Sequence, residues 1–404
     1  MLQPYRDQFN TNFTPAKYND LLARLNELTR TTIEFRVAET PCFFSRTLMS
    51  ELAETGAELT RQLLDNPAYM QASSRTIPEP YRVPNEDHHP QFMTVDFGLA
   101  RNPDGSLTPK LVELQAFPSI FGYQDILSHQ YMETFNLDPN LNCYLADKDE
   151  QTYWQLLGDV IVGDHDPENV VLLEIDPDHQ KTLPDFHVYE DKLHISTVDI
   201  AKLRKQGNCL FYQRAGRDIP IHRIYNRAIV DELQRKNIKL PFDYRDPLDV
   251  EWAGHPNWYF RISKFSLPFL NHPSVPKAVF LDDWFDHRNT ENLPPQREKL
   301  LLKPLYSFAG KGIQFAPTDE DLYAVPIADR HLYLLQERVT FEPVIETPHG
   351  PTQAEIRIMY LWPDGGTLQP AVALVRLGRG LMMGVDHNRD KQWVGSSAAL
   401  TPPL

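Results

Sequence analysis

The segment of the chain with the clearest chemistry is KPLYSFAGKGI, residues 303–313. Lys303 follows an apolar run and is expected at the end of a strand, with Gly310 and Gly312 in the loop before the next strand. Glycine lets backbone N–H groups approach phosphate oxygens without a Cβ in the way, and lysine supplies a positive charge. The segment is not a Walker loop, because no Gly-Lys-Ser/Thr opens a helix. It indicates phosphate binding, and a plain hairpin with a surface lysine is the alternative.

The strand YLLQERV, residues 333–339, is a second candidate, because it ends in Gln336 and Glu337. An apolar strand with this ending fits a hinge where backbone groups bind adenine and a carboxylate accepts hydrogen bonds from ribose hydroxyls. The alternative is a buried strand whose charged end lies in solvent.

Candidate metal ligands occur earlier, in TVDFGLARNPDGSLTPKLVELQAF, which reads as two strands joined by the turn Asn102-Pro103-Asp104-Gly105. Side chains two apart on a strand share a face, so Glu113 and Gln115 are expected to point the same way as Leu111. Asp96 can join them across the hairpin. Two carboxylates and an amide oxygen suit Mg²⁺, although two acids on a solvated sheet face are equally common.

The elements that must position these residues change in character along the chain. The first part is predicted to be helical, since leucines recur at helical spacing between residues 15 and 75. After the hairpin comes a predicted helix from Gln124 to Phe135. Strands VVLLEI and CLFYQ then alternate with helices, one of them expected near STVDIAKLRKQ, as in a small parallel α/β domain. The predicted regions are a helical segment (1–90), the hairpin and helix (91–150), a Rossmann-like α/β subdomain (151–245) and a mostly β nucleotide-binding region (246–404).

Taken together, the motifs resemble the ATP-grasp superfamily: strand-Lys-Gly-loop, about 30 residues, a Gln-Glu hinge, then EIRIMYL…VRLGRG…DHN. In that superfamily the metal-binding Asp and Glu-x-Asn follow on the last strands. Here the chain ends at TPPL, and the matching residues lie upstream as Asp96 and Glu113-x-Gln115. This order is similar to the circularly permuted members, such as the synthetase domain of glutathionylspermidine synthetase and its uncharacterised relatives. The resemblance covers roughly residues 90–400 and implies an α+β, circularly permuted ATP-grasp fold.

The resemblance also implies roles for individual residues. Lys264, in ISKFSLPFL, occupies the position of a further lysine ahead of the phosphate loop. Lys264 and Lys303 are then expected to neutralise the ATP phosphates, with Gln336 at the adenine edge and Glu337 on the ribose. Asp96, Glu113 and Gln115 are expected to hold Mg²⁺.

Two positions depart from the family pattern. Gln115 stands where the family has Asn, one methylene shorter but with the same amide oxygen. Thr94 stands where an arginine often faces the transferred phosphoryl group, so another cation must replace that arginine. The candidates are Arg376, in VRLGRG, and Arg227, in IYNRAI, and either one can instead be a structural salt-bridge partner.

Charge and composition limit the partners. The chain has 404 residues with 40 basic and 55 acidic side chains, a formal net charge of −15. An acidic surface repels a phosphate backbone, so no nucleic-acid partner is expected, and an anion such as ATP needs a local basic pocket. The cysteines Cys42, Cys143 and Cys209 lack metal-ligand spacing and are expected to be reduced. No run of eighteen apolar residues and no signal-like segment occurs, which predicts a cytoplasmic protein without a membrane partner.

The function that the resemblance implies is an ATP- and Mg²⁺-dependent carboxylate–amine ligase that acts through an acyl phosphate. Its partners would be small-molecule carboxylate and amine substrates. Two alternatives stay open. One is an ATP-binding protein of the same fold without ligase activity, which Gln115 and Thr94 favour. The other is a small-molecule kinase, which would release a stable phosphorylated product.

Overall fold

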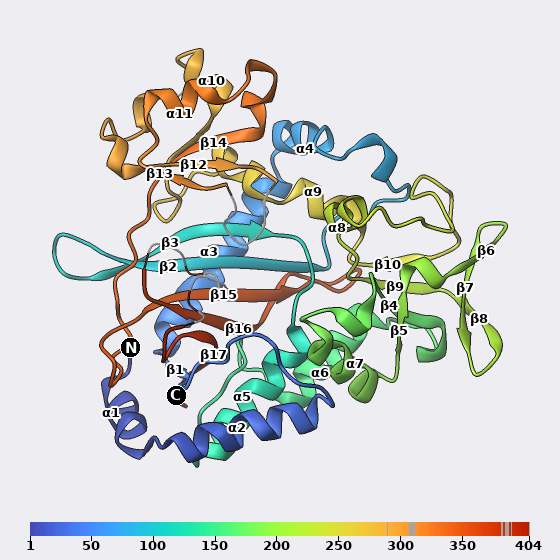
Figure 1. Ribbon diagram of the computed structural model, residues 1–404, viewed down its shortest axis with the longest axis horizontal. Coiled ribbons are helices and arrows are strands. Elements are labelled where there is room, and N and C mark those ends of the chain that lie inside the picture. Colours follow the sequence, from blue (N-terminus) through green and yellow to red (C-terminus); the bar gives the residue numbers. More distant parts are fainter. Residues whose placement is uncertain (289, 307–311, 381–382, 384–387, 389, 404) are drawn as a thin grey trace.

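A large sheet forms the centre of the molecule, with strand order β1-β17-β16-β15-β2-β3 (Figure 1). Its neighbouring strands are antiparallel except β1 and β17, which run parallel. The bounds are β1 Cys42–Phe43, β2 Phe92–Arg101, β3 Leu107–Gln115, β15 Gln353–Leu361, β16 Gln369–Gly378 and β17 Gly395–Leu400. The structure, a computed structural model, describes residues 1–288, 290–306, 312–380, 383, 388 and 390–403.

The predicted hairpin is present as β2 and β3, and its turn places Gly105 at φ +88°, a backbone conformation that favours glycine. The pairing contains a β-bulge: Asp96 lies opposite Glu113, but Phe97 lies opposite Leu111, so Val112 is the extra residue. Because the bulge reverses the alternation, Leu111 is fully buried in the core, on the face of the sheet opposite Glu113. The expectation that Leu111 shares a face with Glu113 is therefore wrong.

Alternation along the central strands separates an apolar face from a mixed face. On β15, Ala354, Ile356, Ile358 and Tyr360 enter the core that also holds residues of α3, Arg46–Leu64. On the other face, α5, Phe121–Phe135, packs on β16 and β17. Glu355 and Arg357 lie on this second face, toward the N-terminal end of β15. The charged side chains therefore lie on the same face of the sheet as α5, next to the area that α5 covers.

The N-terminal region contains α1 Gln3–Asn12, α2 Pro15–Leu28, α3 and α4 Pro67–Ser74. Thr14, Ser45 and Asn66 cap the starts of α2, α3 and α4 with side-chain oxygens, which explains where these helices begin. The prediction of helix throughout 15–75 is wrong for residues 29–45, which are extended or irregular and contribute β1 to the large sheet.

The predicted small parallel α/β sheet is present, with strand order β10-β9-β4-β5 (Figure 1). Its elements are α6 Glu150–Ile161, β4 Val170–Glu174, α7 Leu183–Leu193, β5 Ser196–Asp199, β9 Arg223–Asn226 and β10 Glu251–Ala253. The last strand, β10, lies beyond residue 245, where the sequence placed the end of this region.

The helix expected at residues 196–206 is absent. This segment forms β5, a 3₁₀ turn and β6, because Thr197 and Val198 are β-branched and suit a strand, and Asp199 caps the turn at the N–H of Ala201. An antiparallel meander follows, formed by β6 Arg204–Gln206, β7 Cys209–Arg214 and β8 Arg217–Ile221.

A small antiparallel sheet, order β11-β14-β12-β13, forms a separate lobe above the large sheet (Figure 1, orange). Its elements are β11 Ala278–Phe280, α10 Leu281–Phe285, β12 Leu300–Pro304, β13 Gln314–Phe315, α11 Asp319–Ala324 and β14 Tyr333–Glu337. Leucine side chains of β12, α11 and β14 form a core of their own on one face. The opposite face carries Lys303 and Gln336.

The remaining helical segments are α8 Val230–Arg235, α9 Pro256–Arg261 and the 3₁₀ turns η1 Glu79–Tyr81, η2 Pro167–Asn169, η3 Pro177–His179, η4 Ile200–Lys202, η5 Lys264–Phe269, η6 Thr290–Asn292, η7 Arg297–Lys299 and η8 Ile327–Leu332. Among the residues that the structure describes, no helix has both the length and the apolar character needed to span a bilayer.

The packing of α3 on the large sheet can be tested at Gly56, where a Cβ would stand 2.2 Å from Oη of Tyr360. This hydroxyl donates a hydrogen bond to the carbonyl of Ala53 (2.7 Å). We expect Gly56→Ala to lower the free energy of unfolding by about 1–3 kcal/mol through overpacking. The measurement is urea denaturation.

The matched control is Gly158→Ala on α6, where the nearest atom to the new Cβ would be Cδ2 of Leu193 at 3.6 Å. There the change should raise stability by about 0.5–1 kcal/mol, since alanine favours helix. A Gly56→Ala variant as stable as the wild type would contradict the packing described for α3 and β15.

Candidate active site

Charged side chains from different parts of the chain meet on the mixed face of the large sheet. Asp96 on β2 lies directly opposite Arg357 on β15, and Glu355 lies opposite Arg376 on β16. Arg357 donates from Nε and Nη2 to the two carboxylate oxygens of Asp96 at 2.6 and 2.7 Å. Arg376 donates from Nη2 to Oδ2 of Asp96 at 2.5 Å, and its Nε lies 2.9 Å from Oε1 of Glu355. The two arginines therefore share one carboxylate.

Burial and the neighbouring arginines together determine the pKa values of Asp96 and Glu355. Only 3% of Asp96 is exposed. Burial alone would raise its pKa, but the charges of Arg357 and Arg376 and their hydrogen bonds hold the pKa below its ordinary value. Burial also raises the pKa of Glu355, against the opposing charge of Arg376. Asp96 is therefore ionised at neutral pH.

Two lysines complete the cluster from the side of the small sheet. Nζ of Lys264, at the start of η5, lies 3.5 Å from Oε1 of Glu113 on β3. Lys303, at the end of β12, is 7% exposed, and burial lowers its pKa to about 8. The nearby charges of Glu113 and Glu355 raise this pKa and that of Lys264 lowers it. The β2–β3 hairpin, η5, β12 and β15 thus meet at one place, as the sequence predicted for the hairpin and the strand that ends in Lys303.

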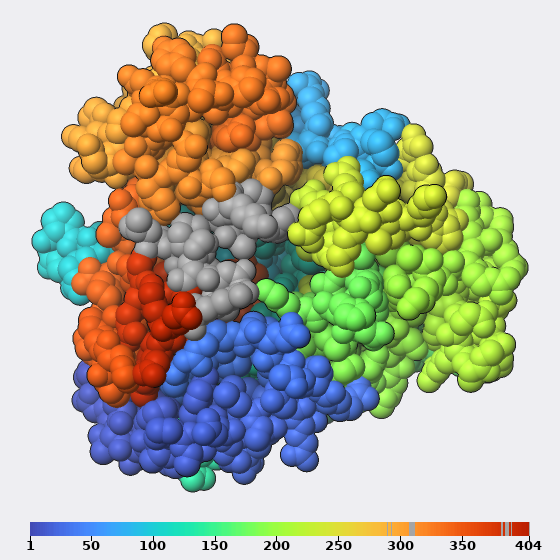
Figure 2. Space-filling model, in the orientation of Figure 1, coloured from blue at the N-terminus to red at the C-terminus, as the bar shows by residue number. Residues whose placement is uncertain are grey.

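The cluster is positive within an acidic molecule. With every group ionised, the cations Lys264, Lys303, Arg357 and Arg376 outnumber the carboxylates of Asp96, Glu113 and Glu355 by one. In the space-filling view the surface is hollowed between the lobe of the small sheet and the yellow-green segments, with teal residues at the bottom (Figure 2). This arrangement can bind a polyanion that enters between the lobe and the large sheet.

The predicted hinge residues lie on β14. Gln336 is 1% exposed, and its Oε1 has no hydrogen-bond partner among the described residues. This oxygen can therefore accept a hydrogen bond from a ligand or from water. Glu337 is half-buried, and its Oε2 accepts a hydrogen bond from the backbone N–H of Lys277 at 3.2 Å. Its second oxygen accepts no hydrogen bond from the described residues.

The structure places the other predicted residues as follows. Gly310 lies outside the described residues. Gly312 has φ +75°, and a Cβ there would stand 3.0 Å from Cγ of Pro304, so glycine suits this turn. Gln115 is half-buried at the end of β3, opposite the buried Thr94.

Arg227 lies away from the charge cluster, after β9 at the carboxyl edge of the parallel sheet. It is buried, lies over the rings of Phe117 and Phe186, and donates a hydrogen bond to the carbonyl of Pro118. Asp185 and Glu174 are its nearby carboxylates. Of the two candidate arginines, Arg376 therefore belongs to the charge cluster and Arg227 to the parallel subdomain.

Sequence reasoning missed Arg357. Its signal is weak but present: Glu355 and Arg357 interrupt the otherwise apolar strand AEIRIMYL at alternate positions, which places both charges on one face. Which carboxylate Arg357 meets depends on strand pairing that spans 261 residues.

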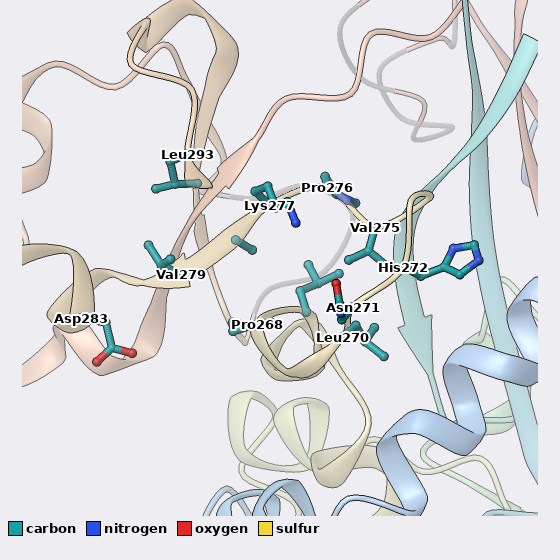
Figure 3. A pocket seen from close by; sticks show the side chains of 12 residues that line it. Pro268, Leu270, Asn271, His272, Val275, Pro276, Lys277, Val279, Asp283 and Leu293 are labelled. Carbon is teal, nitrogen blue, oxygen red and sulfur yellow. The ribbon is translucent and has the colours of Figure 1, made fainter. Parts of the chain in front are cut away.

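A cavity of about 280 Å³ lies beside the free edge of β11, between the loop after η5 and Leu293 (Figure 3). Leu270, Val275 and Lys277 are among its lining residues, and none of the predicted site residues is. We place the candidate site at the charge cluster rather than here, because the cluster gathers buried charged side chains from several elements.

A comparison with solved structures finds 29 similar chains. One is a glutathione synthetase-like effector from Globodera pallida in its apo form, with a TM-score of 0.57 and 12% sequence identity over 97% of this chain and 99% of that chain. This protein therefore has the mixed α+β fold of a glutathione synthetase-like protein. No family model matches the sequence. No curated protein matches it either.

The arrangement of Asp96 does not fit direct ligation of Mg²⁺. Both carboxylate oxygens already accept hydrogen bonds from guanidinium groups, which would lie beside the ion. Among the described residues, no group of three or more His, Cys, Asp or Glu side chains is placed to hold a metal. Glu113 and Gln115 stay predicted ligands.

The Asp96–Arg357 pair should also be central to stability. Arg357→Met leaves a buried carboxylate with one partner fewer and is expected to cost about 3–5 kcal/mol of unfolding free energy. The double variant Asp96→Leu/Arg357→Met should lose less than the sum of the two single changes, because it removes both charges of the pair. The measurement is equilibrium denaturation.

The control pair is Arg204–Asp218 on the meander, joined at 2.6 Å with side chains 53% and 33% exposed. Arg204→Met should change stability by less than about 1 kcal/mol. Additive losses at Asp96 and Arg357 would show that the two side chains do not act as a pair.

Proposed function

We propose that this protein is an ATP-dependent carboxylate–amine ligase with a circularly permuted ATP-grasp fold. The observation that carries the proposal is the position of Lys303, buried beside Lys264 between the small sheet and the charged face of the large sheet. Burying a charged lysine costs free energy, because the ammonium group loses its contact with water. A bound anion offsets this cost. The fold of a glutathione synthetase-like protein agrees with this function.

The strand order supports the proposed permutation. The hairpin that carries Asp96 and Glu113 precedes the small sheet in the chain, whereas β15 and β16 follow it. Yet β2 pairs directly with β15, so one continuous sheet is assembled from both sides of the small lobe. In an unpermuted chain the strands with these acids would come last.

The proposed binding roles follow from the side chains that face the site. Lys264 and Lys303 neutralise the phosphates, and the glycine motif with Gly310 and Gly312 is proposed to bring backbone N–H groups to phosphate oxygens. The unsatisfied Oε1 of Gln336 accepts a hydrogen bond from the adenine amino group, and Glu337 accepts one from a ribose hydroxyl. The role of Gln336 uses an oxygen that has no hydrogen-bond partner among the described residues.

The proposed chemistry has two steps. A substrate carboxylate oxygen attacks the γ-phosphorus of ATP, which gives an acyl phosphate and ADP. An amine nitrogen then attacks the acyl carbon, the carbon–oxygen bond to phosphate breaks, and the amine loses a proton. Arg376 stabilises charge on the transferred phosphoryl group, in the role that Thr94 cannot fill. Arg227 is proposed to act on the acceptor side, at the carboxyl edge of the parallel sheet.

Mg²⁺ is the cofactor that the family resemblance implies. The resemblance assigns it to Glu113 and Gln115, and no step above depends on it. The occupied carboxylate of Asp96 favours a second candidate function, an ATP-binding protein that catalyses no ligation.

Product analysis tests the proposed function. The protein is incubated with ATP and pooled amino acids and short peptides, and ADP and free phosphate are measured. A ligase should form both in equal amounts, and only when a carboxylate and an amine are present. ADP with a stable phosphorylated product would indicate a kinase instead. Bound but unconsumed ATP would favour the binding protein.

ATP affinity should depend on Lys303. Lys303→Ala removes a charge-assisted contact in a buried site, worth about 1.5–3 kcal/mol, so the dissociation constant should rise about tenfold or more. The measurement is isothermal titration calorimetry. Lys299→Ala is the control, since Lys299 is exposed and lies four residues earlier, before β12. An unchanged dissociation constant for Lys303→Ala would remove Lys303 from the site.

The affinity should also depend on pH. Because the pKa of Lys303 is about 8, ATP should bind more weakly at pH 9 than at pH 7. Lys303→Arg should bind ATP equally at both pH values, since arginine stays charged. The stability of the folded protein changes with pH in the opposite direction. The unfolded chain binds more protons between about pH 8 and 10.5, so Lys303 makes the unfolding free energy rise across this window. A pH-independent affinity in the wild type would contradict the buried position of Lys303.

A further inference from the structure

Asp96 has little remaining capacity to bind a cation. A carboxylate offers about four lone-pair sites. Three are used: Oδ2 accepts from Arg357 and Arg376, and Oδ1 accepts from Arg357. The side chain of Asp96 is only 4% exposed. A divalent ion on the last site would lie next to two guanidinium groups in a region with little water to screen them.

These contacts are built into the sheet rather than made by long, adaptable side chains from loops. Asp96 and Arg357 are direct cross-strand partners on β2 and β15, and Glu355 and Arg376 are direct partners on β15 and β16. Opposite charges at paired positions attract one another and fix the side chains. Freeing Asp96 for a metal would break its contacts with Arg357 on the neighbouring strand and with Arg376 on the strand beyond it.

The arginines retain donors for another acceptor. Arg357 uses Nε and Nη2 on Asp96, and Arg376 uses Nη2 on Asp96. Nε of Arg376 lies 2.9 Å from Oε1 of Glu355 without forming a hydrogen bond. No described residue accepts a hydrogen bond from Nη1 of either arginine. The side chain of Arg376 is 25% exposed, so a ligand can reach it. Guanidinium groups bind phosphoryl oxygens through paired N–H donors.

We propose that Arg357 and Arg376, held by Asp96, supply the positive charge that a divalent cation would otherwise supply to the terminal phosphoryl group of ATP. The site therefore binds metal-free ATP. Asp96 is a positioning residue that orients the arginine pair. This inference rests on the proposed ATP site and concerns what neutralises the nucleotide there.

The net charge of the cluster agrees with this assignment. The excess of cations over carboxylates already favours a polyanion, and metal-free ATP carries more negative charge than its Mg²⁺ complex. Glu113, the other carboxylate at this place, lies 3.5 Å from Lys264. Each carboxylate of the cluster thus has a cation of the chain within 4 Å.

The test is calorimetric titration of ATP and of ADP into the protein in EDTA and again in excess Mg²⁺. We expect ATP to bind in EDTA at least as tightly as in Mg²⁺. Arg376→Met should weaken ATP binding in EDTA about tenfold or more while ADP binding changes less than threefold. A purely structural role of Arg376 would weaken both nucleotides alike. Arg376→Lys, which keeps the charge, should restore part of the ATP affinity.

Arg101→Met is the matched control on the same sheet. Arg101 lies at the end of β2, is 49% exposed and pairs with Glu342, so its loss should leave both affinities unchanged. Thermal melts check that each variant is folded. ATP binding that is more than tenfold weaker in EDTA than in Mg²⁺ would overturn the inference. Equal losses of ATP and ADP affinity in Arg376→Met would also overturn it. If neither nucleotide binds in either buffer, the proposed function fails instead.

Discussion

The paired charges of Asp96 and Arg357 link the two halves of the chain. Asp96 is nearly removed from water, and a carboxylate in that position is tolerated only when it is paired and hydrogen-bonded. Its bidentate partner stands on the neighbouring strand, 261 residues later. The register that brings them together also sets Glu113 beside Asp96 and Arg376 beside Glu355. The charged face of the sheet therefore follows from one buried pair.

The site joins this charged face to the small lobe. Lys303 lies near the end of β12, whose Leu300 and Leu302 side chains belong to the core of the lobe. Lys264 begins the turn that contacts β3. The protein carries a net charge of −15, yet these elements collect an excess of positive charge in one place. A basic cluster inside an acidic molecule attracts small anions. The net charge predicted a local basic pocket of this kind for an anion such as ATP.

Sequence patterns predicted those parts of the fold that local chemistry determines. The Asn-Pro-Asp-Gly turn predicted the hairpin, and the apolar runs before Lys303 and Gln336 predicted β12 and β14. The strand GSSAAL, β17, was missed because its small residues show no alternation of apolar and polar side chains. The bulge at Val112 could not be predicted, since a single sequence does not report strand register. The segment 196–206 was predicted as a helix, but its β-branched Thr197 and Val198 lie in a strand.

Motifs named several residues of the charge cluster, but Arg357 and the contacts within the cluster were not predicted. Lys264, Lys303 and Glu113 were chosen from motifs, and the structure brings them together. The partners of Asp96 were not predicted, because two arginines on later strands meet it only through the sheet. A motif identifies which acid belongs to a site, but the neighbours of that acid decide whether it binds a metal or an arginine.

The most direct test of the proposed ATP site is a crystal structure of the protein with a non-hydrolysable ATP analogue. The account predicts phosphate oxygens within hydrogen-bond distance of Nζ of Lys303 and of the guanidinium of Arg376, with the adenine amino group at Oε1 of Gln336. A nucleotide bound elsewhere, for example in the cavity beside β11, would contradict it.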